Sequence, residues 1–397
     1  MFKQVYENNN TIYGDLSKQH NLKFEFKGKD NILFFAGSSA NLNITFNGNN
    51  ALVFVGDRAR VNGNIDIRTN GLLFVGQNST FNGIRITLHE GKNIIFGNDC
   101  MFSWQIWLRS GDSHMIYDSK THQRANFSKS IYIGDHIWCG QEAAILKGAF
   151  VASGSVLGAK SVNSGGMKFS NSIYVGNPAK LIKEGIFWSR EGSWDCEQTK
   201  QYEFNFKKDF IYEFDKEVFL NPVLLEEELD KLESALQKLE FVFDYIHNNT
   251  HKNRFALFKD SDTSECKLYK DESKPAFKTL EFETIKDSAI FRVQNSLTYR
   301  LGQIMISHSK SFKGYLKMPF ALFSCAKEFK KNRTKQKLED IKLPPLENLM
   351  DYKQSLAYKN HLSYKLGSAL IKAHKAWYKG GYIWLYFEIS KITSKKV

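Results

Sequence analysis

The chain has 397 residues, which exceeds one ordinary hydrophobic core and makes two domains the first expectation. A hydrophobic content of 42% with 24% charged residues argues against disorder. Five scattered cysteines without a CxxC pair argue against a disulfide scaffold and a cysteine-ligated zinc site. The opening MFKQVYENNN lacks the pattern of a secretion signal and no apolar run reaches 18 residues, so we expect a cytoplasmic protein.

From residue 31 onward a motif recurs about every twenty residues. Gly37, Gly56, Gly76 and Gly97 are separated by 19, 20 and 21 residues. Each repeat opens with β-branched or aromatic residues, followed by Gly and then by Asn, Asp or Ser. Short strands with turns at a fixed period predict a β-solenoid in which each coil contacts its neighbours. The alternative, an antiparallel sandwich, would show strict apolar/polar alternation without a constant glycine phase.

A polar loop then interrupts the repeats. The stretch RSGDSHMIYD, residues 109–118, places His114 between Asp112 and Asp118. The residues alone leave three roles open for His114: an exposed surface histidine, a metal ligand or a general base. We expect the insertion from Asp112 to Ser130 to carry the chemistry.

The segments after this loop carry motifs that are specific to one protein family. They read IYIGDHIWCGQEAAILKGAFVASGSVLGAKSV and then IYVGNPAKLIK, and with them residues 93–187 resemble the left-handed β-helix acyltransferases with hexapeptide repeats, particularly O-acetyltransferases of sugars and surface polysaccharides. The resemblance implies a mainly β fold, a left-handed parallel β-helix over residues 1–190, in a homotrimer with active sites between subunits. It also implies direct transfer from acetyl-CoA, with His114 as general base and Asp112 or Asp118 fixing its tautomer.

The resemblance assigns further positions to the coenzyme. Trp138 matches the tryptophan beside the pantetheine, backbone N–H groups around Gly140 and Ala159 match the thioester and pantetheine contacts, and Lys180 matches the basic residue that meets the phosphates. Lys160 and Lys183 are weaker candidates for that last role, and Cys139 departs from the family's aliphatic residue. No metal is expected, because the histidines lack the closely spaced pair of the zinc-dependent carbonic anhydrases that share this solenoid; these are His89, His114, His122 and His136.

The second half of the chain lacks the recurring Gly and Asn residues that mark turns, and we expect it to be mainly α-helical. An acidic region, 191–290, carries a net charge of −9 and includes a predicted heptad helix over 217–247. Its apolar residues are spaced 4, 3, 4, 3, 4, 3: Leu225, Leu229, Leu232, Leu236, Leu239, Phe243 and Ile246. Such a stripe fits a trimeric coiled coil or a helix packed on its own domain equally well.

The last region, 291–397, carries a net charge of +15 and an internal duplication, because 295–331 is repeated as 360–396. Each copy is a basic helix, a Lys-Gly break, an aromatic stretch and a lysine cluster. These features suit an anionic membrane surface or a capsule-assembly complex. Binding of the acceptor and a plain helical domain are the alternatives, and no motif supports a nucleic-acid role.

The sequence therefore predicts an acetyl-CoA-dependent O-acetyltransferase of a bacterial capsular or other cell-surface polysaccharide, acting at the inner face of the inner membrane. A non-catalytic β-solenoid that binds carbohydrate or scaffolds an assembly is one alternative. An N-acetyltransferase of an amino sugar is the other, although the first thirty residues are too few for the nucleotide-binding domain that such enzymes usually have.

Overall fold

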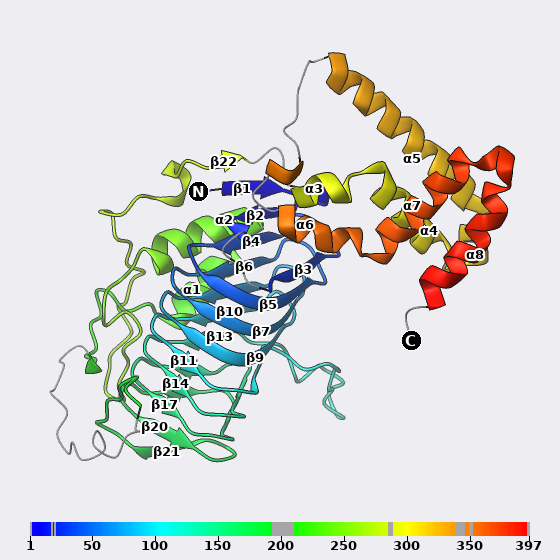
Figure 1. The fold of residues 1–397 in the computed structure, drawn as a ribbon. Helices are drawn as coiled ribbons and strands as arrows, with labels where there is room; N and C mark the ends of the chain where they lie inside the picture. Colours follow the sequence, from blue (N-terminus) through cyan, green and yellow to red (C-terminus); the bar gives the residue numbers. More distant parts are fainter. Residues whose placement is uncertain are drawn as a thin grey trace. The chain divides into compact units, whose positions relative to one another are not determined.

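A computed structural model of the protein describes residues 2–16, 19, 21–192, 210–284, 289–338, 346–348 and 352–394. They belong to two compact units, Met1–Thr284 and Ile285–Val397. In Figure 1 the strands of the first unit stack in successive coils, coloured from blue to green, and the second unit consists of helices.

The first unit is a parallel β-solenoid with three strand positions, or faces, in each coil. Eight parallel strands form the first face: β2 (Thr11–Tyr13), β4 (Ile32–Phe35), β6 (Leu52–Val55), β8 (Leu72–Val75), β10 (Asn93–Phe96), β13 (Ile131–Ile133), β16 (Phe150–Val151) and β19 (Met167–Lys168). The predicted β-solenoid is thereby confirmed, and its left-handed sense stays a prediction.

The second and third faces share one sheet. Long strands span both faces in the early coils: β5 (Ser39–Phe46), β7 (Arg60–Ile67) and β9 (Thr80–Leu88). Later coils divide them, so that the second face holds β11 (Met101–Phe102), β14 (Trp138–Cys139), β17 (Val156–Leu157) and β20 (Ile173–Val175). The third face holds β3 (Lys23–Phe26), β12 (Ile106–Arg109), β15 (Ala144–Leu146) and β18 (Val162–Asn163).

Asparagines hold the turns between coils. Asn50 and Asn70 both adopt a left-handed conformation, with φ of 59°, which asparagine tolerates better than most residues with a side chain. The Asn50 amide donates a hydrogen bond to Asn70 Oδ1 at 3.0 Å, and that of Asn31 donates to Asn10 Oδ1 at 2.9 Å. The asparagines that recur in the sequence therefore lie in the turns of the solenoid, where their side chains bond from one coil to the next.

The first face is buried on both sides. All four residues of β4, β6, β8 and β10 are buried, because one side of each strand fills the solenoid and the other packs against helices. On the outer side the Phe34, Phe54 and Phe74 rings stack at centroid distances of 4.6 and 4.7 Å. This face is a hydrophobic ridge that needs a cover.

The cover comes from the predicted heptad segment. It folds as α1 (Pro222–Asp230), α2 (Ala235–Phe241) and a π-helical turn, η5 (Val242–His247), which Figure 1 shows in green along the first face. Leu225, Leu229, Leu239 and Ile246 are buried in one cluster with the phenylalanine ridge. Of the two arrangements that the sequence leaves open, the structure shows the stripe packed on its own domain.

The segment is not one continuous helix. The chain breaks between α1 and α2, where Ser234 caps α2 through a capping box with Gln237. Asn50 of the solenoid also contributes, because its Oδ1 accepts the Ala235 N–H at 2.6 Å. Leu236, in the middle of the heptad pattern, is 43% exposed beside this break.

A buried ion pair fastens the cover to the solenoid. Arg254 is fully buried and donates to both oxygens of Asp135, from Nη2 at 2.7 Å and from Nε at 2.9 Å. Its Nη1 donates to the carbonyl oxygens of Ile246 and Asn249. The guanidinium thus joins a turn of the solenoid to the end of the cover.

Antiparallel strands lie at the ends of the solenoid. At the first face, β1 (Phe2–Val5) pairs antiparallel with β2 and parallel with β22 (Glu283–Thr284). At the second face, β21 (Lys180–Lys183) pairs antiparallel with β20.

The second unit confirms the predicted helical C-terminal region. Its helices are α3 (Ala289–Gln294), α4 (Leu297–His308), α5 (Phe312–Leu338), α6 (Tyr352–Lys359), α7 (Leu362–Lys375) and α8 (Gly381–Ser394), with short 3₁₀ turns η7 (Leu346–Asn348) and η8 (Trp377–Lys379). Helix α4 packs on α7, while α5 packs on α4 and α8 on α7. Within the described parts of the chain, no helix is long and apolar enough to cross a bilayer.

Two glycines let the copies of the duplication meet. A Cβ added to Gly302 would lie 1.7 Å from the Ser363 carbonyl oxygen, and one added to Gly367 would lie 1.7 Å from that of Thr298. Gly302 corresponds to Gly367 in the duplication, and Thr298 to Ser363. Helices α4 and α7 therefore cross with a local twofold relation, in which each glycine contacts a backbone carbonyl of the other copy.

Candidate active site

The histidine loop is anchored at its base. It connects β12 on the third face to β13 on the first, and Arg124 Nη1 lies 2.5 Å from Glu90 of the preceding coil. The Arg124 and Ser128 hydrogen bonds lower the pKa of the Glu90 carboxyl to about 2. A second ion pair joins Lys147 to Asp112 at 2.6 Å. These contacts hold a polar insertion against the solenoid.

His114 lies exposed on this loop. Within the described part of the chain its imidazole has no hydrogen-bond partner, while its backbone carbonyl accepts from Asn126. The Asp112 carboxylate accepts from Lys147 and Asn126, which lower its pKa. Asp118 accepts backbone N–H groups of its own turn. Neither aspartate contacts the imidazole in a single chain.

The residues predicted for the coenzyme follow one edge of the solenoid. Trp138, on β14, is 42% exposed, and Ala159 and Lys180 are also exposed. The Gly140 N–H donates to the Leu157 carbonyl at 2.8 Å, so it is part of the stacking between coils. In the described chain the Ala159 N–H has no such bond, and this donor is open to a ligand. Lys160 pairs with a glutamate of the neighbouring coil at 3.4 Å.

The two groups of predicted residues lie at opposite edges of the third face. Gly140 and Ala159 occupy turns that lead into this face, whereas the His114 loop follows its exit. A strand of four residues spans roughly 13 Å. In the described structure no hydrogen bond or ion pair connects the loop to Trp138, Gly140 or Ala159. One chain does not bring these groups together.

His136, in the GDH segment, is part of the packing. Its ring stacks on Trp188 at 4.0 Å, with Nε2 3.0 Å from the Trp188 carbonyl oxygen, and burial lowers its pKa. The Trp188 ring also lies 6.0 Å from that of Trp138. Cys139 is buried, which raises the pKa of its thiol. Within the described residues, no group of three or more His, Cys, Asp or Glu side chains could hold a metal ion.

A groove of about 930 Å³ follows the third face and reaches the histidine loop. Arg85, Trp107, Arg109 and Ser113 line it among others. The Arg109 guanidinium lies 5.2 Å from the Trp107 ring centre and donates to Ser113 Oγ at 2.6 Å. Neither residue of this pair is among those predicted from the sequence. The alternation in IWLR, with two buried and two outward residues, is the signal that marks both side chains as outward-facing.

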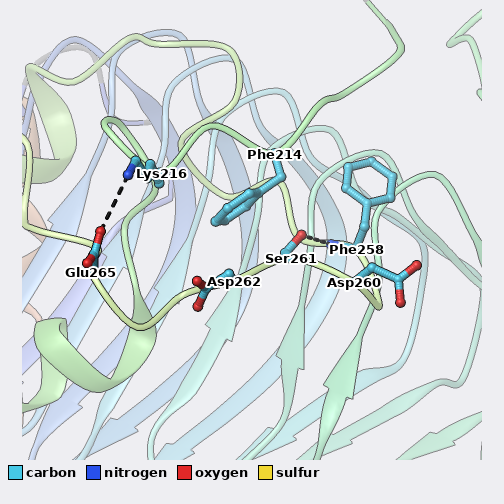
Figure 2. A pocket seen from close by; sticks show the side chains of 7 residues that line it. All are labelled: Phe214, Lys216, Phe258, Asp260, Ser261, Asp262 and Glu265. Atoms are coloured by element: carbon cyan, nitrogen blue, oxygen red, sulfur yellow. Dashed lines mark hydrogen bonds and ion pairs between the residues drawn. The ribbon is translucent and has the colours of Figure 1, made fainter.

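A second pocket, shown in Figure 2, lies elsewhere in the first unit. Phe214 and Phe258 form its apolar part, and its rim carries one lysine and three acidic residues: Lys216, Asp260, Asp262 and Glu265. Lys216 lies 3.5 Å from Glu265. The acidic excess disfavours coenzyme phosphates, and none of the predicted site residues lines this pocket.

Comparison with protein families gives a match over residues 197–396 to a family described as "Domain of unknown function (DUF8374)". The chain belongs to this family. The DUF8374 segment contains the cover of the solenoid's first face and also all helices of the second unit. Its first part is therefore an integral layer of the solenoid unit.

The chain also matches acetyltransferases. The polysialic acid O-acetyltransferase of Neisseria meningitidis is 28% identical over 150 residues, which are 38% of this chain and 70% of that protein. The enzyme of the same name from Escherichia coli O1:K1 / APEC is 33% identical over 98 residues, 25% of this chain and 32% of that protein. The solved structure of the polysialic acid O-acetyltransferase OatWY is 26% identical, with a TM-score of 0.43, covering 51% of this chain and 98% of that one. The predicted resemblance and the acyltransferase class are confirmed.

Proposed function

We propose that the protein is an acetyl-CoA-dependent O-acetyltransferase that modifies hydroxyl groups of a bacterial capsular or other cell-surface polysaccharide. The observation that carries this proposal is His114, an exposed imidazole on a loop that two ion pairs anchor to an acetyltransferase-type solenoid. A sugar hydroxyl is a poor nucleophile at neutral pH, and a neutral imidazole is a suitable base for it.

In the proposed reaction His114 accepts the hydroxyl proton while the sugar oxygen attacks the thioester carbonyl carbon. A carbon–oxygen bond forms, and the carbon–sulfur bond breaks as the coenzyme A thiolate leaves and takes up a proton. No covalent enzyme intermediate is required. Because Asp112 is occupied by Lys147 and Asn126, its proposed role is to hold the loop, and it would act on the imidazole only through that position.

The coenzyme side of the site is proposed along the opposite edge. The open Ala159 N–H would donate to a pantetheine or thioester carbonyl, and exposed Trp138 would pack beside the pantetheine. Gly140 would contribute through its lack of a side chain rather than its N–H, because a Cβ there would lie 2.6 Å from the Ala159 nitrogen. Lys180, exposed at the start of β21, would meet the phosphates.

We propose a homotrimer of left-handed solenoids in which each site lies between two subunits. The base and the coenzyme residues lie at opposite edges of the third face, so one complete site needs the loop of one subunit and the opposite edge of another. The first face is covered by the chain's own helices, which leaves the other faces for assembly. Mixing His114→Asn with Trp138→Ala subunits should restore part of the activity that each variant lacks. No restoration, although exchange of subunits is demonstrated, would contradict sites between subunits.

The proposed acceptor is an anionic polysaccharide. Two relatives are named polysialic acid O-acetyltransferases. The groove that ends at Ser113 offers Arg85 and Arg109 beside Trp107, a combination that suits an acidic sugar. We place the reaction at the inner face of the bacterial inner membrane, where such polymers are made.

The test is acetyl transfer by the purified full chain. Incubation with acetyl-CoA and a panel of acidic capsular polysaccharides, polysialic acid among them, should release coenzyme A and add O-acetyl groups visible by NMR. His114→Asn should lower the rate by on the order of 10²–10⁴. His122→Asn is the matched control, because His122 is exposed on the same loop with φ of 57°, a conformation that asparagine tolerates. Equal rates for both variants would contradict the assignment of the base.

A further inference from the structure

The second unit exposes large apolar side chains on the two helices that end the copies of the duplication. In α5, Leu316 is 63% and Phe320 79% exposed; in α8, Ile383 is 71% and Phe387 60% exposed. Residues four apart lie on one side of a helix, so each pair forms an apolar stripe. Single exposed apolar residues are common on proteins, but aligned pairs are not.

The duplication relates these stripes to one another. In the alignment that pairs Tyr315 with Tyr382, Leu316 corresponds to Ile383 and Phe320 to Phe387. Both copies therefore place an aliphatic residue and a phenylalanine at equivalent, outward positions.

The exposed stripes are distinct from those that hold the unit together. In α8 the interior stripe is formed by Leu385, Ile389 and Ile392, which pack against α7. In α5 the equivalent stripe includes Cys325, which is buried. Each helix thus has one apolar stripe inside the unit and a second, uncovered by described residues, outside it.

Lysines and further aromatic residues flank the exposed stripes. The exposed lysines on or beside these helices are Lys313, Lys317, Lys327, Lys330, Lys375, Lys379 and Lys391. The exposed aromatic residues near them are Tyr315, Phe323, Trp377, Tyr378, Tyr382, Trp384 and Tyr386. Acidic residues are few, and residues 291–397 carry +15 overall. Apolar stripes bordered by lysine, tryptophan and tyrosine match the headgroup region of an anionic bilayer.

The length of the helices fixes the mode of binding. Helix α8 has 14 residues, about 21 Å, which is shorter than the hydrocarbon core of a bilayer. Helix α5 has 27 residues but is interrupted by lysines along its length. Both helices can lie in the interface, and neither can span it.

We infer that α5 and α8 form a duplicated anchor that seats this protein on an anionic lipid surface, with Leu316, Phe320, Ile383 and Phe387 inserted among the acyl chains. The inference rests on the proposed function for its biological setting, since a polysaccharide O-acetyltransferase would thereby work where its polymer is made. Two stripes give two points of attachment, and the second binds at the high local concentration set by the first.

Vesicle co-sedimentation of the full chain tests the anchor. The protein should sediment with vesicles of phosphatidylcholine and phosphatidylglycerol, bind pure phosphatidylcholine much less, and be released as salt is raised. Phe320→Ser and Phe387→Ser should each weaken binding roughly ten-fold, and the double variant should lose it. Lys327→Ser should weaken it roughly five-fold. Val223→Ser is the matched control, because Val223 is 62% exposed on α1 of the first unit.

Three outcomes would overturn the inference. The first is that the wild-type protein binds neither kind of vesicle. The second is that the Phe320→Ser/Phe387→Ser double variant binds vesicles as well as the wild type does. The third is that the wild-type protein self-associates in lipid-free solution and the double variant does not, which would make the stripes an interface between copies. Coenzyme A release with a soluble acceptor, measured on the same samples, separates the two proposals. His114→Asn should bind vesicles like wild type, and the double variant should still transfer acetyl groups to the soluble acceptor.

Discussion

Replacing Arg254 by methionine should destabilise the first unit strongly. The side chain is fully buried, and its loss removes the hydrogen bonds to Asp135 as well as those to the carbonyls of Ile246 and Asn249. Methionine fills much of the volume, so the main effect is a buried carboxylate without its counter-charge. Breaking a buried pair in this way costs about 3–5 kcal/mol. For a unit of this size, a loss of ~4 kcal/mol lowers the melting temperature by roughly 7 °C.

Differential scanning calorimetry of the full chain measures this effect. The double variant Arg254→Met/Asp135→Asn should lose less than the sum of the two single changes, because the stranded charge is removed together with its partner. Glu228→Gln is the matched control, since it breaks the exposed pair with Lys231, which water and salt screen, and should leave the melting temperature almost unchanged. A loss below about 1 kcal/mol for Arg254→Met, or strict additivity in the double variant, would refute the claim that this pair fastens the cover to the solenoid.

Two further predictions concern the cover and the duplication. Burial lowers the pKa of His247 to about 4, below its usual 6.5, so the unfolded state binds the extra proton between these values. Stability should therefore be complete above pH 6.5 and fall by up to about 3 kcal/mol as the pH drops toward 4, and His247→Phe should flatten this part of a denaturation-versus-pH series. Gly302→Ala should force α4 and α7 apart, at a cost of about 1–3 kcal/mol, and make the second unit more sensitive to proteolysis, whereas Ser307→Ala on the exposed side of α4 should not.

The sequence predicts the solenoid because its signal is local and repeated. Left-handed turn residues recur at a constant spacing, as at Asn50 and Asn70, and the phased glycines stand where the next coil leaves no room for a Cβ, so the period of about twenty residues appears directly in the chain. The apolar runs ILFF, LVFV and LLFV also indicate strands that are buried on both sides. They lack the alternation of apolar and polar residues that a strand with one solvent-exposed side shows. Such runs are the sequence signal of a first face that is covered on its outer side.

Other features depend on residues far apart in the chain. The heptad stripe of 217–247 has the same apolar pattern whether its partner is another helix or a sheet, so the sequence left both possibilities open. Arg254 stands in an ordinary polar stretch, and its partner Asp135 is 119 residues away. Likewise, the motifs point to His114 and Trp138 separately, but only the coil geometry shows that the His114 loop and the turn after Trp138 lie at opposite edges of the third face.

The end strands of the solenoid bear on how the protein stays dispersed. A stack of parallel rungs offers the next rung an unpaired edge, and a second molecule could extend it indefinitely. At one end of the first face that edge belongs to β22, a two-residue strand paired with β1, which itself runs antiparallel to the stack. At the second face it belongs to β21, whose direction is reversed and whose ends are Lys180 and Lys183. Short length, reversed polarity and charge at these strands each oppose the addition of another molecule, so these edges resist end-to-end growth into fibrils.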